Sequence, residues 1–149
     1  MTKTKWHSAA LLLSITLAAG AQAEPTVVDP GLTVRTVASG LTTPVSMAFI
    51  GADDMLVLEK NTGRVMRVTN GVAQTVLDLA VNFASERGLL GIALHPDFPT
   101  NAGVYLYWTE STTGGDTSVL GETPLLGHRV DRWVWNGSAD GAIYEVLRR

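Results

Sequence analysis

Apolar residues recur along this chain in short runs that are separated by turn residues. An alternation of apolar and polar positions with a period of two predicts strands that bury one face. After Ala23, no run keeps the 3.6-residue apolar period of a helix over a helical length. The pattern therefore predicts an all-β chain. The predicted strands are Leu32–Val37, Val45–Ile50, Met55–Glu59, Val65–Val68, Thr75–Leu77, Leu89–Leu94, Val104–Glu110, Arg129–Trp135 and Ile143–Leu147.

The strand pattern repeats once. Val45–Ile50, an acidic turn and Met55–Glu59 form one unit, and a similar unit begins at Leu89 after roughly 45 residues, a spacing typical of propeller blades. The dipeptide Asn70-Gly71, between two apolar runs, predicts a tight hairpin. The first strand of each unit is almost continuously apolar, which predicts an innermost blade strand packed on both faces.

A long loop is expected at residues 111–126, which are rich in Ser, Thr and Gly. This composition favours a mobile surface excursion within the second unit. A functional loop is the alternative, because long loops in compact domains often carry function.

Residues 1–23 are predicted to be a signal peptide. Lys3 and Lys5 give a basic start, an apolar run follows, and Ala21-Gln22-Ala23 supplies a small-residue cleavage site. The alternative, a membrane anchor, is disfavoured because the run is shorter than the about 20 residues that span a bilayer. The mature chain is expected to be residues 24–149, periplasmic or secreted.

Removing this leader makes the charge balance more acidic. All 14 acidic residues lie from Glu24 onward, while two of the 11 basic residues are Lys3 and Lys5, so the charge becomes (11 − 2) − 14 = −5. This disfavours nucleic acid and anionic membrane surfaces as partners. The chain has no cysteine, which excludes disulfides and zinc–thiolate chemistry.

Residues 85–98, with the sequence SERGLLGIALHPDF, resemble the signature of the glucose/sorbosone dehydrogenase family. Shorter matching pieces stand in the expected order at Gly40–Pro44, Glu59–Val65 and Arg129–Trp133. The resemblance extends from about residue 32 to residue 136 and implies a six-bladed β-propeller, of which this chain carries about the first two blades.

The resemblance also implies a function: oxidation of aldose sugars at C1 to lactones with PQQ and calcium as cofactors and an external electron acceptor. Glu86, Arg87 and Gly88 are the predicted cofactor-binding residues, because they precede an inner strand and so lie at the rim of the central cavity. Glu86 stands where soluble glucose dehydrogenases carry a glutamine, and a carboxylate there can accept a sugar hydroxyl. Arg87 is suited to a PQQ carboxylate, and a structural ion pair with Glu86 is the alternative. Gly88 allows a close approach of the backbone.

No residue of this chain matches the family's catalytic histidine or its calcium ligands, so no catalytic or metal residue is assigned. His95 is interpreted as part of a structural turn, with Asp97 capping its own backbone, and His128 as a surface residue. Asp53 and Asp54 are interpreted as a hairpin turn. The three tryptophans expected to pack between blades are Trp108, Trp133 and Trp135.

A second hypothesis of another class remains open. The chain is then an exported, non-catalytic propeller fragment that acts as a binding or self-associating module, because exposed blade edges favour pairing between chains.

Overall fold

The computed structural model describes residues 26–122, 127–137 and 143–145. Its contacts divide the chain into two units, Met1–Arg35 and Thr36–Arg149. In the first unit, the described residues form one turn at Asp29. The backbone N–H of Leu32 donates to the Asp29 carbonyl oxygen at 3.1 Å, and that of Gly31 donates to the Asp29 carboxylate at 2.8 Å. The predicted signal peptide and its cleavage site lie outside the described residues.

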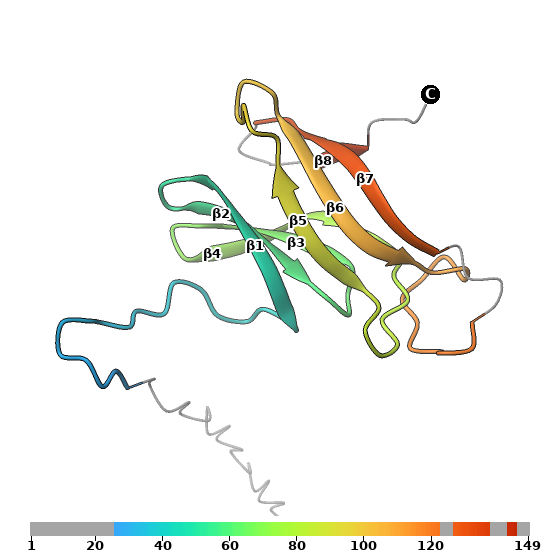
Figure 1. Cartoon of the computed structure of the whole chain (residues 1–149), viewed down its shortest axis with the longest axis horizontal. Helices are drawn as coiled ribbons and strands as arrows, with labels where there is room; N and C mark the ends of the chain where they lie inside the picture. Colours follow the sequence, from blue (N-terminus) through green and yellow to red (C-terminus); the bar gives the residue numbers. More distant parts are fainter. Residues whose placement is uncertain (1–25, 123–126, 138–142, 146–149) are drawn as a thin grey trace, which may run out of the picture. The chain divides into compact units, whose positions relative to one another are not determined.

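The second unit consists of two four-stranded antiparallel sheets, and its described residues contain no helix (Figure 1). In each sheet, hydrogen-bonded neighbours follow chain order. We call β1–β4 blade one and β5–β8 blade two. The strands are β1 (Pro44–Gly51), β2 (Asp54–Glu59), β3 (Arg64–Thr69), β4 (Val72–Asp78), β5 (Leu89–Leu94), β6 (Gly103–Glu110), β7 (Gly127–Trp135) and β8 (Ile143–Glu145). The all-β prediction is confirmed, and so is the repeat.

The hairpin between β3 and β4 follows from its two turn residues. Asn70 and Gly71 have φ values of 51° and 78°, and positive φ at both central positions is the requirement of a type I′ turn. That turn matches the right-handed twist of the two strands, so the Asn-Gly dipeptide fixes their register, in which Thr69 pairs with Val72.

The main hydrophobic core contains side chains from both blades. Leu56, Leu58 and Val65 of blade one are fully buried and belong to the same cluster as the three tryptophans of blade two, none of which is more than 7% exposed. Tryptophans are thus packing residues here, as the sequence predicts.

A polar contact crosses between the blades at the edge of this core. The Arg67 guanidinium of β3 lies 5.2 Å from the centre of the Trp135 ring of β7, a cation–π geometry. Arg67 also makes an ion pair of 2.6 Å with Asp54, and the hydrogen bond to that carboxylate raises the pKa of Arg67. Asp54 is therefore engaged in a structural ion pair beside the predicted turn.

Two sequence-based expectations are wrong. Leu32–Val37 forms no strand, because it has no ladder partner among the described residues and its Leu32, Val34 and Val37 side chains are exposed. The first strand of blade one is not packed on both faces: Val45, Met47 and Phe49 are 48–58% exposed. β1 is an edge strand, and only its other face is turned toward the core that it shares with blade two.

The outermost strand of blade two is shorter in the described residues than predicted. β8 covers Ile143–Glu145 and pairs with Trp133–Trp135, while residues 146 and 147 lie outside the described part of the chain.

Candidate functional site

Four connecting segments meet where β1 and β5 begin and where β2 and β6 end. They are residues 42–43, the turn 60–63, the loop 79–88 and residues 111–122. Backbone hydrogen bonds join them across the two blades. The Lys60 N–H donates to the Thr43 carbonyl oxygen at 3.0 Å, and the Leu89 N–H donates to the Lys60 carbonyl oxygen at 3.1 Å. The predicted site residues lie in this cluster of connections.

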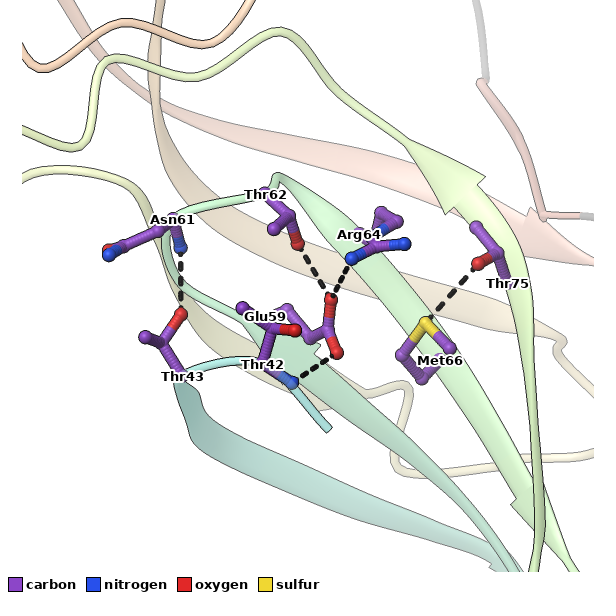
Figure 2. Close-up of polar contacts among 8 residues, drawn as sticks. All are labelled: Thr42, Thr43, Glu59, Asn61, Thr62, Arg64, Met66 and Thr75. Atoms are coloured by element: carbon purple, nitrogen blue, oxygen red, sulfur yellow. Dashed lines mark hydrogen bonds and ion pairs between the residues drawn. The ribbon is translucent and has the colours of Figure 1, made fainter. Parts of the chain in front are cut away.

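A buried carboxylate organises the blade-one side of the cluster (Figure 2). Glu59, the last residue of β2, is 1% exposed. It accepts hydrogen bonds from the Thr42 N–H at 2.6 Å and the Thr62 hydroxyl at 2.7 Å, and its Oε2 lies 3.0 Å from the Arg64 guanidinium. Glu59 therefore connects the entry to β1 with both ends of the β2–β3 turn.

Gly63 closes the same turn against the following loop. Its φ is 63°, and a Cβ at this position would lie 1.8 Å from the Leu79 carbonyl oxygen. The Leu79 N–H in turn donates to the Gly63 carbonyl oxygen at 3.1 Å. Only glycine fits this position, so the turn is fixed against the loop that leads to blade two.

Gly88 is required for a reason that the sequence does not reveal. Its φ is 123°, and a Cβ there would lie 2.4 Å from the Lys60 carbonyl oxygen. The Gly88 carbonyl oxygen accepts a hydrogen bond from the Thr109 N–H at 2.9 Å. The close backbone approach predicted at Gly88 is thus an approach to the turn of blade one.

Glu86 and Arg87 lie beside each other but do not form the ion pair that was the structural alternative. The Arg87 Nη1 donates to the Leu120 carbonyl oxygen at 3.1 Å. Glu86 is exposed and has no hydrogen-bond or ionic partner among the described residues. The exposed Glu86 carboxylate and the half-buried Arg87 side chain therefore lie next to each other just before β5.

The described part of the predicted long loop, residues 111–122, is attached to the preceding loop by hydrogen bonds, while residues 123–126 lie outside the described residues. Asn82, which is fully buried, donates from Nδ2 to the Glu122 carboxylate at 2.6 Å and to the Val119 carbonyl oxygen at 3.1 Å. The Asp116 carboxylate accepts from the Val81 N–H at 3.0 Å, and the Thr117 carbonyl oxygen accepts from the Phe83 N–H at 2.8 Å. The loop is thereby attached along residues 81–83.

Glu122 is the main anchor of this loop. Its Oε1 accepts hydrogen bonds from the Thr112 N–H and hydroxyl and from the Ser111 hydroxyl. These donors, the Thr112 hydroxyl first, stabilise the carboxylate form and lower the pKa of Glu122. These hydrogen bonds therefore favour the charged form of Glu122.

A charged network lies on β6 and β7. Arg129 pairs with Glu110 at 2.5 Å and with Asp131 at 2.8 Å, and its guanidinium lies 5.2 Å from the centre of the Trp108 ring. Trp108 donates from Nε1 to Asp131 at 3.0 Å. The hydrogen bond to Glu110 is the main cause of the raised pKa of Arg129. The Arg129–Trp133 piece of the family signature is therefore structural.

Neither of the two described histidines, His95 and His128, belongs to the four segments of this cluster. His95 lies in the β5–β6 turn at the opposite end of blade two, and its Nδ1 accepts a hydrogen bond from the Asp97 N–H at 3.1 Å. His95 is structural as predicted, but it is the histidine, not the Asp97 side chain, that caps the turn. His128 is exposed on β7, stacked on Tyr107 with 5.8 Å between ring centres.

Sequence reasoning missed three residues of this cluster. Lys60 donates from Nζ to the Ser85 carbonyl oxygen at 2.6 Å, while Asn82 and Glu122 join the long loop to the core. Lys60 belongs to the quoted piece Glu59–Val65, which was a usable signal. Asn82 and Glu122 are 40 residues apart, and no local pattern connects them.

The described residues contain neither a metal-binding cluster nor a membrane-spanning helix. In residues 26–122, 127–137 and 143–145, no group of three or more His, Cys, Asp or Glu side chains could hold a metal ion. The same part of the chain has no helix with the length and apolar character needed to cross a bilayer.

Comparisons with known proteins agree on one family. A family model described as Glucose / Sorbosone dehydrogenase matches residues 41–134. An uncharacterised protein of Synechocystis sp. is 30% identical over 116 residues, which is 70% of this chain and 28% of that protein.

Two solved structures resemble the chain. An oxidoreductase of Thermus thermophilus, described as a glucose dehydrogenase, has a TM-score of 0.58 and 33% identity over 75% of this chain and 30% of its own. The PQQ-bound aldose sugar dehydrogenase of Streptomyces coelicolor has a TM-score of 0.53 and 29% identity over 78% of this chain and 33% of its own. The chain therefore spans about a third of the length of these relatives, and its two blades are part of a propeller.

Proposed function

We propose that this chain supplies two blades of an exported enzyme that oxidises aldoses at C1 to lactones with PQQ. The proposal starts from the fact that the chain belongs to the glucose/sorbosone dehydrogenase family. The family supports a general role in sugar oxidation. The cofactor, the lactone product and the location outside the cytoplasm belong to the proposal.

One structural observation supports Glu86 and Arg87 as the binding residues in this proposal. Glu86 and Arg87 lie on the loop that precedes β5, and hydrogen bonds attach this loop to Lys60 of blade one and to Leu120 of blade two. Glu86 has no hydrogen-bond or ionic partner among the described residues. Binding groups that are held by a rigid scaffold and remain available to a ligand are typical of functional loops.

The two side chains are suited to different ligands. Arg87 uses Nη1 for the Leu120 carbonyl oxygen, and its remaining N–H groups can donate to a carboxylate of PQQ. The Glu86 carboxylate repels such an anion but accepts hydrogen bonds from sugar hydroxyls. In this proposal Arg87 orients the cofactor and Glu86 orients the sugar.

The chemistry itself depends on groups beyond these two residues. When bound, PQQ supplies the acceptor for the two electrons and the hydrogen that leave C1 of the sugar. The described residues offer a cation for its carboxylates, which fits the cofactor, but no group of three ligands for calcium. We therefore assign calcium and the catalytic base to none of the described residues, and these residues have a binding and orienting role.

The test uses the native protein, purified from its own cells by a chromosomally encoded tag. We expect dye reduction that requires an aldose, disappears when PQQ and calcium are removed with a chelator, and returns when both are added back. No aldose-dependent reduction by the reconstituted native protein contradicts the proposal. The 149-residue chain produced alone is the control, and we expect it to show no such activity.

A second candidate function is supported by the exposed face of β1. Val45, Met47 and Phe49 form an apolar row on an edge strand, and such a row favours association between chains. A non-catalytic, self-associating module should sediment as a defined oligomer without any cofactor. A monomer in the presence of the full catalytic activity excludes this candidate.

A further inference from the structure

We infer that Lys60 is a positioning residue for the loop Ser85–Gly88, so that a turn of blade one sets the geometry of the proposed binding residues of blade two. The inference rests on the proposed function, because this geometry matters to catalysis only if Glu86 and Arg87 line the pocket. Lys60 acts through the loop and is not itself assigned a contact with cofactor or sugar.

Lys60 contacts both ends of the loop. At the first end, its Nζ donates to the Ser85 carbonyl oxygen at 2.6 Å. At the second end, its carbonyl oxygen accepts from the Leu89 N–H at 3.1 Å and lies against Gly88, where it leaves no room for a Cβ. Glu86 and Arg87 are the two residues between these contacts.

The loop needs such support because its backbone conformation at Ser85 is unfavourable. Ser85 has a φ of 55°, in the left-handed region that non-glycine residues rarely occupy. The Arg87 N–H donates to the Ala84 carbonyl oxygen at 3.2 Å, which makes a tight turn around Ser85. A hydrogen bond from an ammonium group to the Ser85 carbonyl oxygen stabilises this turn more than a neutral donor does.

Lys60 is itself held in place. Its N–H donates to the Thr43 carbonyl oxygen at 3.0 Å, and the N–H of Asn61 donates to the Thr43 hydroxyl at 3.2 Å. The residue before it is the buried Glu59. Since these contacts involve the backbone of Lys60 and Asn61, a change of the Lys60 side chain removes the hydrogen bond to Ser85 and leaves them in place.

The first experiment measures how often the loop opens. An arginine-specific protease cuts the Arg87–Gly88 bond of the native protein only after local opening, because Gly88 is buried. We expect Lys60→Met to be cut about tenfold faster than wild type, because it lacks the charged hydrogen bond that keeps the loop closed. Lys60→Arg retains a cationic donor and should be cut at close to the wild-type rate.

Arg132→Met is the matched control for this measurement. It removes a hydrogen bond to the Asn101 side chain, of 3.0 Å, at the opposite end of blade two. We expect this variant to be cut after Arg87 at the wild-type rate. Unfolding in urea, followed by tryptophan fluorescence, establishes that each variant is folded.

The second experiment asks whether the opening affects the site. Apoprotein of each variant is titrated with PQQ in the presence of calcium, and the concentration for half-maximal activity is measured. We expect Lys60→Met to need about tenfold more PQQ, with kcat at saturation within about twofold of wild type, and Lys60→Arg to restore the affinity.

The outcomes separate the two proposals. Wild-type cleavage rates in Lys60→Met overturn the inference, and so does faster cleavage with an unchanged PQQ requirement. Wild-type protein without PQQ-dependent activity overturns the proposed function, and the cleavage rates then still decide whether Lys60 holds the loop.

Discussion

Glu59 in blade one and Glu122 in blade two are both buried carboxylates that hold a connection at the same end of the blades, but they do so in different ways. Glu59 joins the entry to β1 with a four-residue turn and has a cation, Arg64, among its partners. Glu122 holds a long loop through neutral donors, one of which, Asn82, is 40 residues away.

The glycines of the two segments show the same difference. A Cβ at Gly63 would lie 1.8 Å from a backbone oxygen, whereas a Cβ at Gly114, Gly115 or Gly121 would meet no atom within 4 Å. The turn is tightly packed at Gly63, whereas the loop has open space at its three glycines. We therefore expect the turn to set geometry and the loop to tolerate change.

Replacing Gly63 with Ala should have the largest effect on stability. The substitution places a Cβ against the Leu79 carbonyl oxygen and forces alanine into a left-handed backbone conformation. We expect a loss of about 3 kcal/mol or more in the free energy of unfolding, measured by urea unfolding with tryptophan fluorescence. A loss below about 1 kcal/mol contradicts the tight packing of the turn.

Glu59→Ala should have the second-largest effect on stability. It removes the acceptor of the Thr42 N–H and the Thr62 hydroxyl and leaves Arg64 without this ion pair. Because Arg64 is partly exposed, we expect a loss of about 2 kcal/mol, less than for a fully buried pair. Glu59→Gln keeps one acceptor oxygen and should lose less. A loss below about 0.5 kcal/mol in Glu59→Ala would contradict the role of the carboxylate.

The attachment of the long loop should depend on pH. The pKa of Glu122 is lowered in the folded protein, chiefly by the Thr112 hydroxyl. Its stabilising contribution is therefore complete above the unfolded pKa of about 4.3 and is lost as the pH falls through the folded pKa. The protection factors of the amides in residues 112–121, which correct for the slower intrinsic exchange in acid, should fall with pH in the wild type relative to those of β2. In Glu122→Gln they should depend less on pH.

Gly115→Ala should have the smallest effect and is the matched counterpart of Gly63→Ala. Its Cβ enters open space, and its φ is not in the left-handed region. We expect a change within about 0.5 kcal/mol in the same urea measurement. A loss comparable to that of Gly63→Ala would remove the distinction between the two segments.

The sequence correctly predicted those features of the fold that depend on local patterns of residues. The Asn70-Gly71 turn, the strands of both blades and the family resemblance are confirmed, because they depend on neighbouring residues or on a motif in chain order. Leu32–Val37 has a strand pattern as good as the others, but a strand also needs a ladder partner, which sequence alternation cannot reveal.

The candidate site was predictable only in part. The signature led to the Glu86–Gly88 segment, and the role of these residues as cofactor contacts stays a prediction. The supports of that segment depend on contacts between residues far apart in the chain, such as Lys60 with Ser85 and Arg87 with Leu120. No sequence period or motif reports such distant contacts.

The central claim is that these two sheets are blades of a larger exported sugar dehydrogenase. Its most direct test is the intact mass of the native protein, isolated from the cells that make it. Because 75–78% of this chain covers 30–33% of the two solved relatives, we expect roughly two and a half times the mass of these 149 residues, with Glu24 as the first residue. A mass equal to that of residues 24–149 would contradict the claim and favour the non-catalytic module.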